Sequence, residues 1–309
     1  MKQLIIETQN LTLNFNNKIR ALDNLTLQVP QGVIFGFLGA NGSGKTTTIH
    51  LLLGLLKPTS GSAKVFGHDT QIQGDLIRDR TGVLLEHSGL YERLNAWENL
   101  EFYGRICRLP KKERSDRIKE LLCDMSLWSR RYDKVGKWSR GMKQKLARAR
   151  ALLHRPSLVF LYEPAAGLDP VAAAILAEAL TEMVAKEKVT VFLTTHHLAE
   201  AEKLCDRVGI LKNGKLLASG SPNELKAKCL VSKIEIYGRG FSDRLQQSLR
   251  SNHLVIDFQV RKNRLLINLH LKAEVSALVR FLIKAGCEIE AVHQNQGSLE
   301  EVFLDLMEE

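Results

Sequence analysis

Short runs of apolar residues recur along the first two thirds of the chain without alternating with polar residues. Such uninterrupted runs are typical of strands buried on both faces of a parallel sheet. Segments with apolar residues at helical spacing lie between them, so the pattern predicts an α/β domain with a largely parallel sheet. The expected strands are 33–38, 63–66, 82–85, 158–161 and 189–193, and the expected helices are 48–54, 71–79, 96–125 (interrupted at Pro110), 139–153, 171–186 and 198–204.

Two patterns that flank this alternation indicate antiparallel pairing. Residues 2–13 and 25–30 have the character of strands around a turn at 14–18. Residues 208–211 and 215–218 surround Asn213-Gly214. This dipeptide favours the two-residue turn of a β-hairpin, so we expect a hairpin to close the domain.

The character of the chain changes near residue 230, where short alternating strands replace the apolar runs. The strands are expected at 233–237, 255–260, 265–270 and 287–293, and the helices at 242–250 and 273–285. The order β-α-β-β-α-β suggests a small ferredoxin-like α+β domain. A last amphipathic helix follows, with Ser298 and Glu301 as its capping box.

Composition and charge narrow the class of protein. The chain has 309 residues, of which 44% are hydrophobic and 25% charged, as in globular proteins. No apolar stretch approaches the roughly 18 residues that a membrane span needs, and residues 1–7 have the pattern of a first strand rather than of a signal peptide. We therefore expect a cytoplasmic protein unless a partner holds it at a membrane.

The five cysteines and the positive net charge indicate neither a metal site nor a nucleic-acid-binding surface. No pair of cysteines has metal-ligand spacing, so reduced thiols are expected. The net charge is +10, but the basic residues are dispersed and form no stripe interleaved with aromatic residues. A solvated basic surface, and no nucleic-acid partner, is the interpretation that we favour.

The segment between the strand 33–38 and the following helix carries the first chemical signal. Its sequence, Gly39-Ala40-Asn41-Gly42-Ser43-Gly44-Lys45-Thr46-Thr47, fits the phosphate-loop pattern G-x-x-x-x-G-K-[ST]. Glycines let backbone N–H groups turn toward a phosphate, and the helix N-terminus adds positive potential. Lys45 would reach the β- and γ-phosphates of a nucleotide, and the Thr46 hydroxyl would help to hold Mg²⁺.

A phosphate loop alone leaves kinases, GTPases and many ATPases open, and a second motif narrows the choice. The stretch Trp138-Ser139-Arg140-Gly141-Met142-Lys143-Gln144 resembles one form of the signature of ATP-binding-cassette (ABC) ATPases. The chain resembles the ATP-binding subunit of an ABC transporter over roughly residues 3–226, and it is most similar to the exporter-type (ABC-2-like) branch.

The resemblance implies a domain organisation as well as an activity. It implies an ABC ATP-binding domain over 1–226, with an antiparallel β subdomain and a helical subdomain at about 86–155, before the small domain at 230–309. It also implies that ATP and Mg²⁺ are bound. The partners would be a second ATP-binding subunit, alike or different, and a separate transmembrane permease that keeps the protein at the inner face of the membrane.

Individual roles follow from the resemblance where residues match. Phe15 would stack on adenine, and Ser139 and Gly141 would clamp the γ-phosphate of ATP on a second subunit. Glu163 would be the general base, Asp169 would lie in the loop at the dimer interface, and His196 would contact the γ-phosphate and orient the attacking water. Glu86 occupies the position of a glutamine that senses the γ-phosphate and Mg²⁺.

Two positions depart from the family pattern. Tyr162 stands where an aspartate usually helps to hold Mg²⁺, and an uncharged phenol is a poor ligand for this ion. Glu86 supplies a carboxylate that could compensate, although some members of the branch also have glutamate there. Ala165, where threonine is common, is a milder departure.

Three hypotheses about function remain open at this point. The first is an ATP-hydrolysing motor of an export transporter, in which the helical region 86–125 carries the contact with the permease. The second is a subunit that binds nucleotide but hydrolyses it weakly, because of Tyr162. The third is a cassette ATPase that acts on DNA or ribosomes, although such proteins usually carry two cassettes or a long coiled-coil insert, which this sequence lacks.

Overall fold

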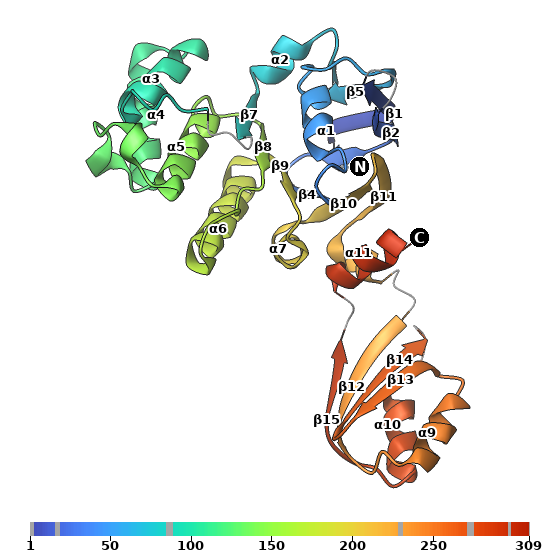
Figure 1. The fold of residues 1–309 in the computed structure, drawn as a ribbon. Helices are drawn as coiled ribbons and strands as arrows, with labels where there is room; N and C mark the ends of the chain where they lie inside the picture. The colour runs from blue at the N-terminus through green and yellow to red at the C-terminus, as the bar shows by residue number, and fades with distance from the viewer. Residues whose placement is uncertain are drawn as a thin grey trace. The chain divides into compact units, whose positions relative to one another are not determined.

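The computed structural model describes residues 3–15, 19–84, 89–227, 231–270, 275–295 and 298–308. Contacts along the chain divide it into two compact units, Met1–Ser219 and Gly220–Glu309, shown in Figure 1. This division lies a few residues before the boundary expected at 226. In the described part of the chain, no helix is both long and apolar enough to cross a bilayer.

A six-stranded sheet with a parallel core forms the centre of the first unit. The strand order is β11-β10-β4-β9-β8-β7, and the pairs from β10 to β7 are parallel. Every residue of β4 and β9 is buried, which explains why their sequences do not alternate. The prediction of an α/β domain with a mainly parallel sheet is confirmed. The strands are β4 (Ile34–Leu38), β7 (Thr81–Leu84), β8 (Leu158–Tyr162), β9 (Thr190–Thr195), β10 (Arg207–Lys212) and β11 (Lys215–Gly220).

A second, antiparallel sheet contains the N-terminal strands. β1 pairs with β2, β3 and β5, and β5 pairs with β6. The second strand begins at Ile19, earlier than the expected 25–30, and a separate short strand covers 28–30. The strands are β1 (Leu4–Phe15), β2 (Ile19–Leu25), β3 (Gln28–Pro30), β5 (Ser60–Val65) and β6 (His68–Asp69).

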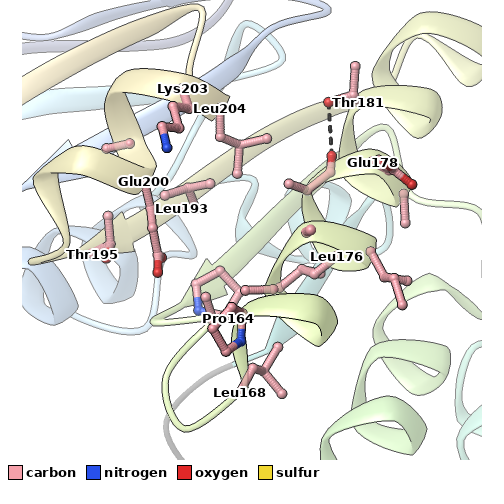
Figure 2. Close-up of a pocket in the computed structure, with 18 of the residues that line it drawn as sticks. Pro164, Leu168, Leu176, Glu178, Thr181, Leu193, Thr195, Glu200, Lys203 and Leu204 are labelled. Carbon is pink, nitrogen blue, oxygen red and sulfur yellow. Dashed lines mark hydrogen bonds between the residues drawn. The ribbon is translucent and has the colours of Figure 1, made fainter.

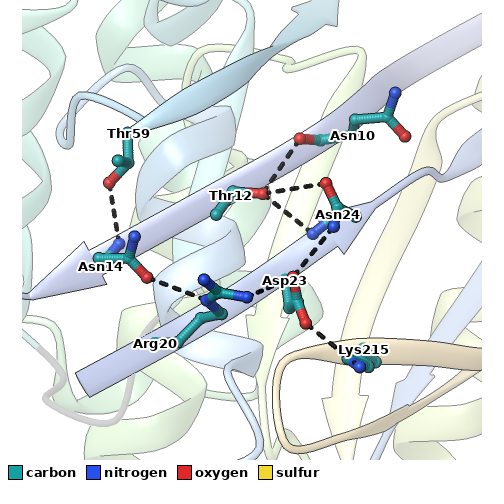
Figure 3. Close-up of polar contacts among 8 residues, drawn as sticks. All are labelled: Asn10, Thr12, Asn14, Arg20, Asp23, Asn24, Thr59 and Lys215. Atoms are coloured by element: carbon teal, nitrogen blue, oxygen red, sulfur yellow. Dashed lines mark hydrogen bonds and ion pairs between the residues drawn. The ribbon is translucent and has the colours of Figure 1, made fainter. Parts of the chain in front are cut away.

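Polar contacts connect the antiparallel sheet to the β10–β11 hairpin. The Asp23 carboxylate on β2 binds Arg20 at 3.2 Å and Lys215 of β11 at 3.3 Å, and it accepts a hydrogen bond from Asn24 (Figure 3). The backbone N–H of Asp23 also donates to Gly214 O in the hairpin turn, at 3.0 Å. The N–H of Gly214 in turn donates to Ser43 O at 2.9 Å. The hairpin therefore links the antiparallel sheet to the phosphate loop.

Three helices of the first unit enclose an apolar core of their own. Helices α3, α4 and α5 bury residues that include Leu100, Ile118 and Leu146 in one cluster. They stand together to one side of the sheet in Figure 1. The helices of the unit are α1 (Lys45–Leu52), α2 (Gly74–Arg78), α3 (Ala96–Ile106), α4 (Lys111–Asp124), α5 (Arg140–Leu152), α6 (Pro170–Glu187) and α7 (Leu198–Leu204), with short 3-10 turns at Trp128–Arg130 and Val135–Lys137.

The second unit contains a four-stranded antiparallel sheet in the order β13-β14-β12-β15. Leu245 of α9 and Leu278 of α10 pack with Ile236 and Leu265 in its core, and both helices lie on one side of the sheet (Figure 1). This is the expected ferredoxin-like arrangement, and that prediction is confirmed. The elements are α8 (Pro222–Lys226), β12 (Val231–Arg239), α9 (Asp243–Arg250), β13 (Val255–Arg261), β14 (Arg264–His270), α10 (Val275–Lys284), β15 (Glu288–Asn295) and α11 (Leu299–Glu308), of which α8 and α11 contact each other.

Candidate functional site

The phosphate loop connects β4 to α1, and its shape depends on glycine. A Cβ atom at Gly39 would lie 2.5 Å from Leu211 O and 2.6 Å from the Ser43 hydroxyl. Gly44 caps α1 with a φ of +110°, a conformation that side chains disfavour. The local sequence therefore forces a tight loop whose backbone leads directly into the first turn of a helix.

The side chains of the loop carry charge and an unpaired hydroxyl. Lys45 is only 4% exposed, and its Nζ donates to Gly39 O at 2.8 Å and to Ala40 O at 3.0 Å. Burial lowers the pKa of Lys45, and the nearby charge of Glu163 acts in the opposite direction. The Ser43 hydroxyl is buried, and no residue that the structure describes hydrogen-bonds to it. A phosphate would offer an acceptor to both groups, so the loop fits the phosphate chain of a nucleotide.

The remaining loop residues lie at the surface near the start of α1. Ala40, Asn41, Gly42 and Thr46 are exposed, and Thr47 is half-buried. The exposed Thr46 hydroxyl in the first helical turn is an available oxygen ligand for Mg²⁺. Glu86, the other expected ligand, lies outside the described residues.

Glu163 and His196 meet where two neighbouring parallel strands end. Glu163 follows β8 and His196 follows β9, and the Glu163 N–H donates to Thr194 O at 2.9 Å. Glu163 Oε1 lies 2.8 Å from His196 Nδ1. The other carboxylate oxygen, Oε2, is buried without a hydrogen-bond partner among the described residues. A buried carboxylate, bonded to an imidazole and close to Lys45, can polarise a water molecule.

Tyr162 occupies the last position of β8, opposite Thr194 of β9. Its side chain is half-buried. The strand end therefore carries one carboxylate, Glu163, where the family pattern has two.

Ser139 and Gly141 lie at the N-terminus of α5. The Ser139 hydroxyl accepts a hydrogen bond from Met142 N at 3.3 Å, so it caps the helix. Apart from its chain neighbours and the backbone of its own helix, no described atom lies within 4 Å of a Cβ placed on Gly141, so an anion could approach this turn closely. In Figure 1 this helix stands apart from α1, so the fold does not bring the two serine- and glycine-rich turns together within one chain.

Helix α5, which begins within the signature stretch, contacts the loop that follows Glu163. Gln144 Nε2 donates to Pro164 O at 3.3 Å, and a Cβ on Gly167 would lie 3.3 Å from the Arg140 guanidinium. Asp169 ends this loop and caps α6, because its Oδ1 accepts from Ala172 N at 2.9 Å. These contacts join the start of α5 to the short loop that follows Glu163.

Phe15 ends β1, and 42% of it is exposed. An exposed ring is available to stack on a flat ligand, whereas a core position would have buried it. The fold does not use this side chain in a buried cluster.

A groove of about 950 Å³ lies behind the Glu163 loop (Figure 2). Pro164 and Leu168 of that loop, Leu176 of α6, Leu193 of β9 and Leu204 of α7 line it. No phosphate-loop residue contributes to its wall. The groove is mainly apolar, so it is distinct from the nucleotide site.

These features define the class of protein as a phosphate-loop nucleotide-binding protein. Residues 22–166 match the ABC transporter family. The bacitracin transport ATP-binding protein BcrA of Bacillus licheniformis is 34% identical over 304 residues, which cover 98% of this chain and 97% of the relative. The daunorubicin resistance ATP-binding protein DrrA3 of Streptomyces coeruleorubidus is 35% identical and covers 93% and 91%, respectively.

Solved structures agree with the sequence relatives. An ATP-binding subunit of an ABC transporter is 32% identical with a TM-score of 0.66, over 72% of this chain and 92% of the other. CbiO1 of Clostridium perfringens, part of the ABC transporter complex cbiONQ, is 25% identical with a TM-score of 0.67, over 74% and 92%. The chain belongs to the ATP-binding subunits of ABC transporters, and its relatives include exporter-type subunits.

Two residues of the site were not expected from the sequence. In the sequence Gln144 stands out only as part of the signature stretch, yet its side chain connects α5 to the loop that follows Glu163. His197 follows His196 directly, and the centroids of the two imidazole rings are 4.1 Å apart. The repeated histidine was the only signal in the sequence that could have identified it.

Proposed function

We propose that this protein is the ATP-hydrolysing motor subunit of an export transporter. The hydrogen-bonded pair of Glu163 and His196, placed beside Lys45 at the carboxyl ends of β8 and β9, carries the proposal. Ligands of open α/β sheets bind at this edge. A carboxylate, an imidazole and a lysine converge there on the space that a γ-phosphate and its attacking water need.

The chain's own groups divide the work of hydrolysis. Lys45 exchanges its bonds with loop carbonyls for the phosphates, together with the backbone N–H groups of the loop. Glu163 accepts a hydrogen bond from the attacking water and orients it. His196 fixes the Glu163 carboxylate and presents its exposed ring edge to the γ-phosphate. Thr46 would help to hold Mg²⁺, which would supply positive charge beside the phosphate oxygens.

A second subunit completes the site in this proposal. Ser139 and Gly141 are exposed or open at a helix N-terminus, which favours an anion from outside the chain. Asp169 and Phe15 are exposed as well. We assign Phe15 to the adenine of the same chain, and Asp169 to the interface. One solved relative is a dimer in a post-hydrolysis state with ADP and Pi, which supports this arrangement.

The motor would act on a separate transmembrane permease from the inner face of the membrane. The relatives that cover nearly the whole chain are named for bacitracin transport and daunorubicin resistance, which supports an export role. Exposed aromatic residues on the helical part of the first unit, such as Tyr91 and Phe102, are available for the contact with the permease.

The test is Mg²⁺-dependent ATP turnover by the full-length protein. Glu163→Gln should lower kcat by about 10²–10⁴-fold, the usual contribution of a general base. Glu178→Gln is the matched control, because it makes the same chemical change on the exposed side of α6. Equal turnover by the wild-type protein and Glu163→Gln would refute the assignment of the base.

A second candidate function is a subunit that binds ATP but hydrolyses it weakly. Tyr162 favours it, because the phenol removes a carboxylate from the Mg²⁺ side of the site. Background turnover by the wild-type protein, raised at least tenfold by Tyr162→Asp, would support this candidate over the motor. Appreciable wild-type turnover that Glu163→Gln abolishes would reject it.

A further inference from the structure

Glu163, His196 and His197 form a cluster of three metal-binding side chains. One ligand atom from each lies within 4.8 Å of the other two. The histidine rings are in contact, and one of them is hydrogen-bonded to the carboxylate at 2.8 Å. Two imidazoles and one carboxylate are a donor set found in catalytic zinc sites, whereas Mg²⁺ prefers oxygen ligands only.

An unsatisfied atom within the cluster provides an independent reason to expect a cation there. Glu163 is about nine-tenths buried, at 9% exposure, and its Oε2 has no hydrogen-bond partner among the described residues. A buried carboxylate oxygen without a donor is costly. A divalent cation bound at this edge of the carboxylate would satisfy that oxygen.

The backbone keeps the three ligands together while their rings remain free to adjust. The Glu163 N–H donates to Thr194 O, and the His197 N–H donates to the Thr195 hydroxyl at 3.0 Å, so both ligand-bearing turns are fixed to the end of β9. Donors around tetrahedral Zn²⁺ lie roughly 3.3 Å apart for bond lengths of about 2.0–2.1 Å. Side-chain rotations of the two exposed histidines would bring the present separations to this value.

We propose that Glu163, His196 and His197 bind Zn²⁺, with water at the fourth position, and that the bound ion inhibits the ATPase. Zinc would occupy the carboxylate that must accept a hydrogen bond from the attacking water. It would also hold the imidazole that must face the γ-phosphate. Binding rests on the geometry alone, and the inhibition rests on the proposed function.

The direct test uses nucleotide-free, full-length protein and Co²⁺ as a spectroscopic probe. We expect the visible absorption of four-coordinate Co²⁺ with nitrogen and oxygen ligands, saturating at one ion per chain and displaced by Zn²⁺. His197→Ala should weaken binding at least about tenfold, since even the loss of an outer-shell partner of a metal ligand costs that much. His253→Ala removes an exposed histidine of the second unit and should change nothing. The cysteines are the same in all three proteins, so they cannot produce the difference.

A second measurement is ATP turnover at buffered concentrations of free Zn²⁺ with Mg²⁺-ATP in excess. The wild-type protein should lose activity, and His197→Ala, measured against its own zinc-free rate, should need at least tenfold more Zn²⁺ for the same fractional inhibition. No saturable Co²⁺ site, or equal affinity in the wild-type protein and His197→Ala, would overturn the proposal. If the protein hydrolysed no ATP, the proposed function would fail, yet the Co²⁺ spectrum would still decide the metal site.

Discussion

Replacing Phe192 by alanine should destabilise the first unit strongly, because this residue joins three strands of the parallel sheet. Phe192 lies in β9 and is fully buried. Its ring centroid is 5.4 Å from that of Phe35, 5.3 Å from that of Phe37 and 5.3 Å from that of Phe160. The first two neighbours belong to β4 and the third to β8, so the contacts extend to both sides of β9.

The magnitude follows from these contacts. Truncating a buried phenylalanine to alanine costs about 3–5 kcal/mol of unfolding free energy. Aromatic pairs contribute about 0.5–1.5 kcal/mol each beyond the buried area, which places a ring with three partners near the upper end. We expect a loss of about 4–5 kcal/mol from a total of about 5–15 kcal/mol. Phe192→Leu keeps much of the volume but loses the ring contacts, so it should cost about 1–2 kcal/mol.

The assay is guanidinium unfolding followed by tryptophan fluorescence. All three tryptophans of the chain, at 97, 128 and 138, belong to the first unit. Ile267→Ala, in the core of the second unit, is the control and should leave the guanidinium midpoint of the fluorescence transition unchanged. A loss below about 1 kcal/mol for Phe192→Ala, the ordinary cost of a point mutation, would refute the reasoning.

Two further predictions concern titratable groups. The hydrogen-bonded Arg114 guanidinium lowers the pKa of Glu101, so this ion pair stabilises the fold above pH 4.5. The contribution is lost as the pH falls through the lower folded-state pKa. The difference in urea midpoint between the wild-type protein and Glu101→Gln should therefore shrink toward pH 3, and a constant difference would contradict this prediction. Burial raises the pKa of the Cys205 thiol to about 12, so an aromatic disulfide reagent at pH 8 should modify the exposed Cys123 and leave Cys205 unmodified, as peptide mass spectrometry would reveal.

The strands of the parallel sheet could be predicted from the sequence, whereas β2 could not. Burial of β9 on both faces gives an apolar run that needs no knowledge of its neighbours. In β2 only Leu22 and Leu25 are fully buried, because register shifts in β1 between Leu11 and Asn14 break the two-residue period. Asn24, with a φ of +52°, adds a second irregularity. The sequence did not predict β2 because the irregular pattern of this strand depends on bulges in its pairing with β1.

The same distinction between local and distant information applies to the site. The phosphate loop is a local motif, since glycines and a helix start within nine residues specify it. The contact between Glu163 and His196 joins residues 33 positions apart, and it exists because β8 and β9 are neighbours in the sheet. The bonds from Lys45 to carbonyls of its own loop also could not be anticipated, because they depend on the loop's exact backbone path.

Because Tyr162 is not an aspartate, Glu163 is the one carboxylate at the end of β8 that could either hold Mg²⁺ or orient the attacking water. Glu163 Oε1 is bonded to His196, and the Glu163 backbone is fixed to Thr194, so this carboxylate is oriented toward the imidazole. A Glu163 that moved to hold Mg²⁺ would lose that contact and could no longer orient the water. In the proposed motor, Mg²⁺ would therefore be held by groups other than this strand end, among them Thr46 and the phosphates. The affinity for Mg²⁺, rather than the activation of water, is then the property that Tyr162→Asp changes first.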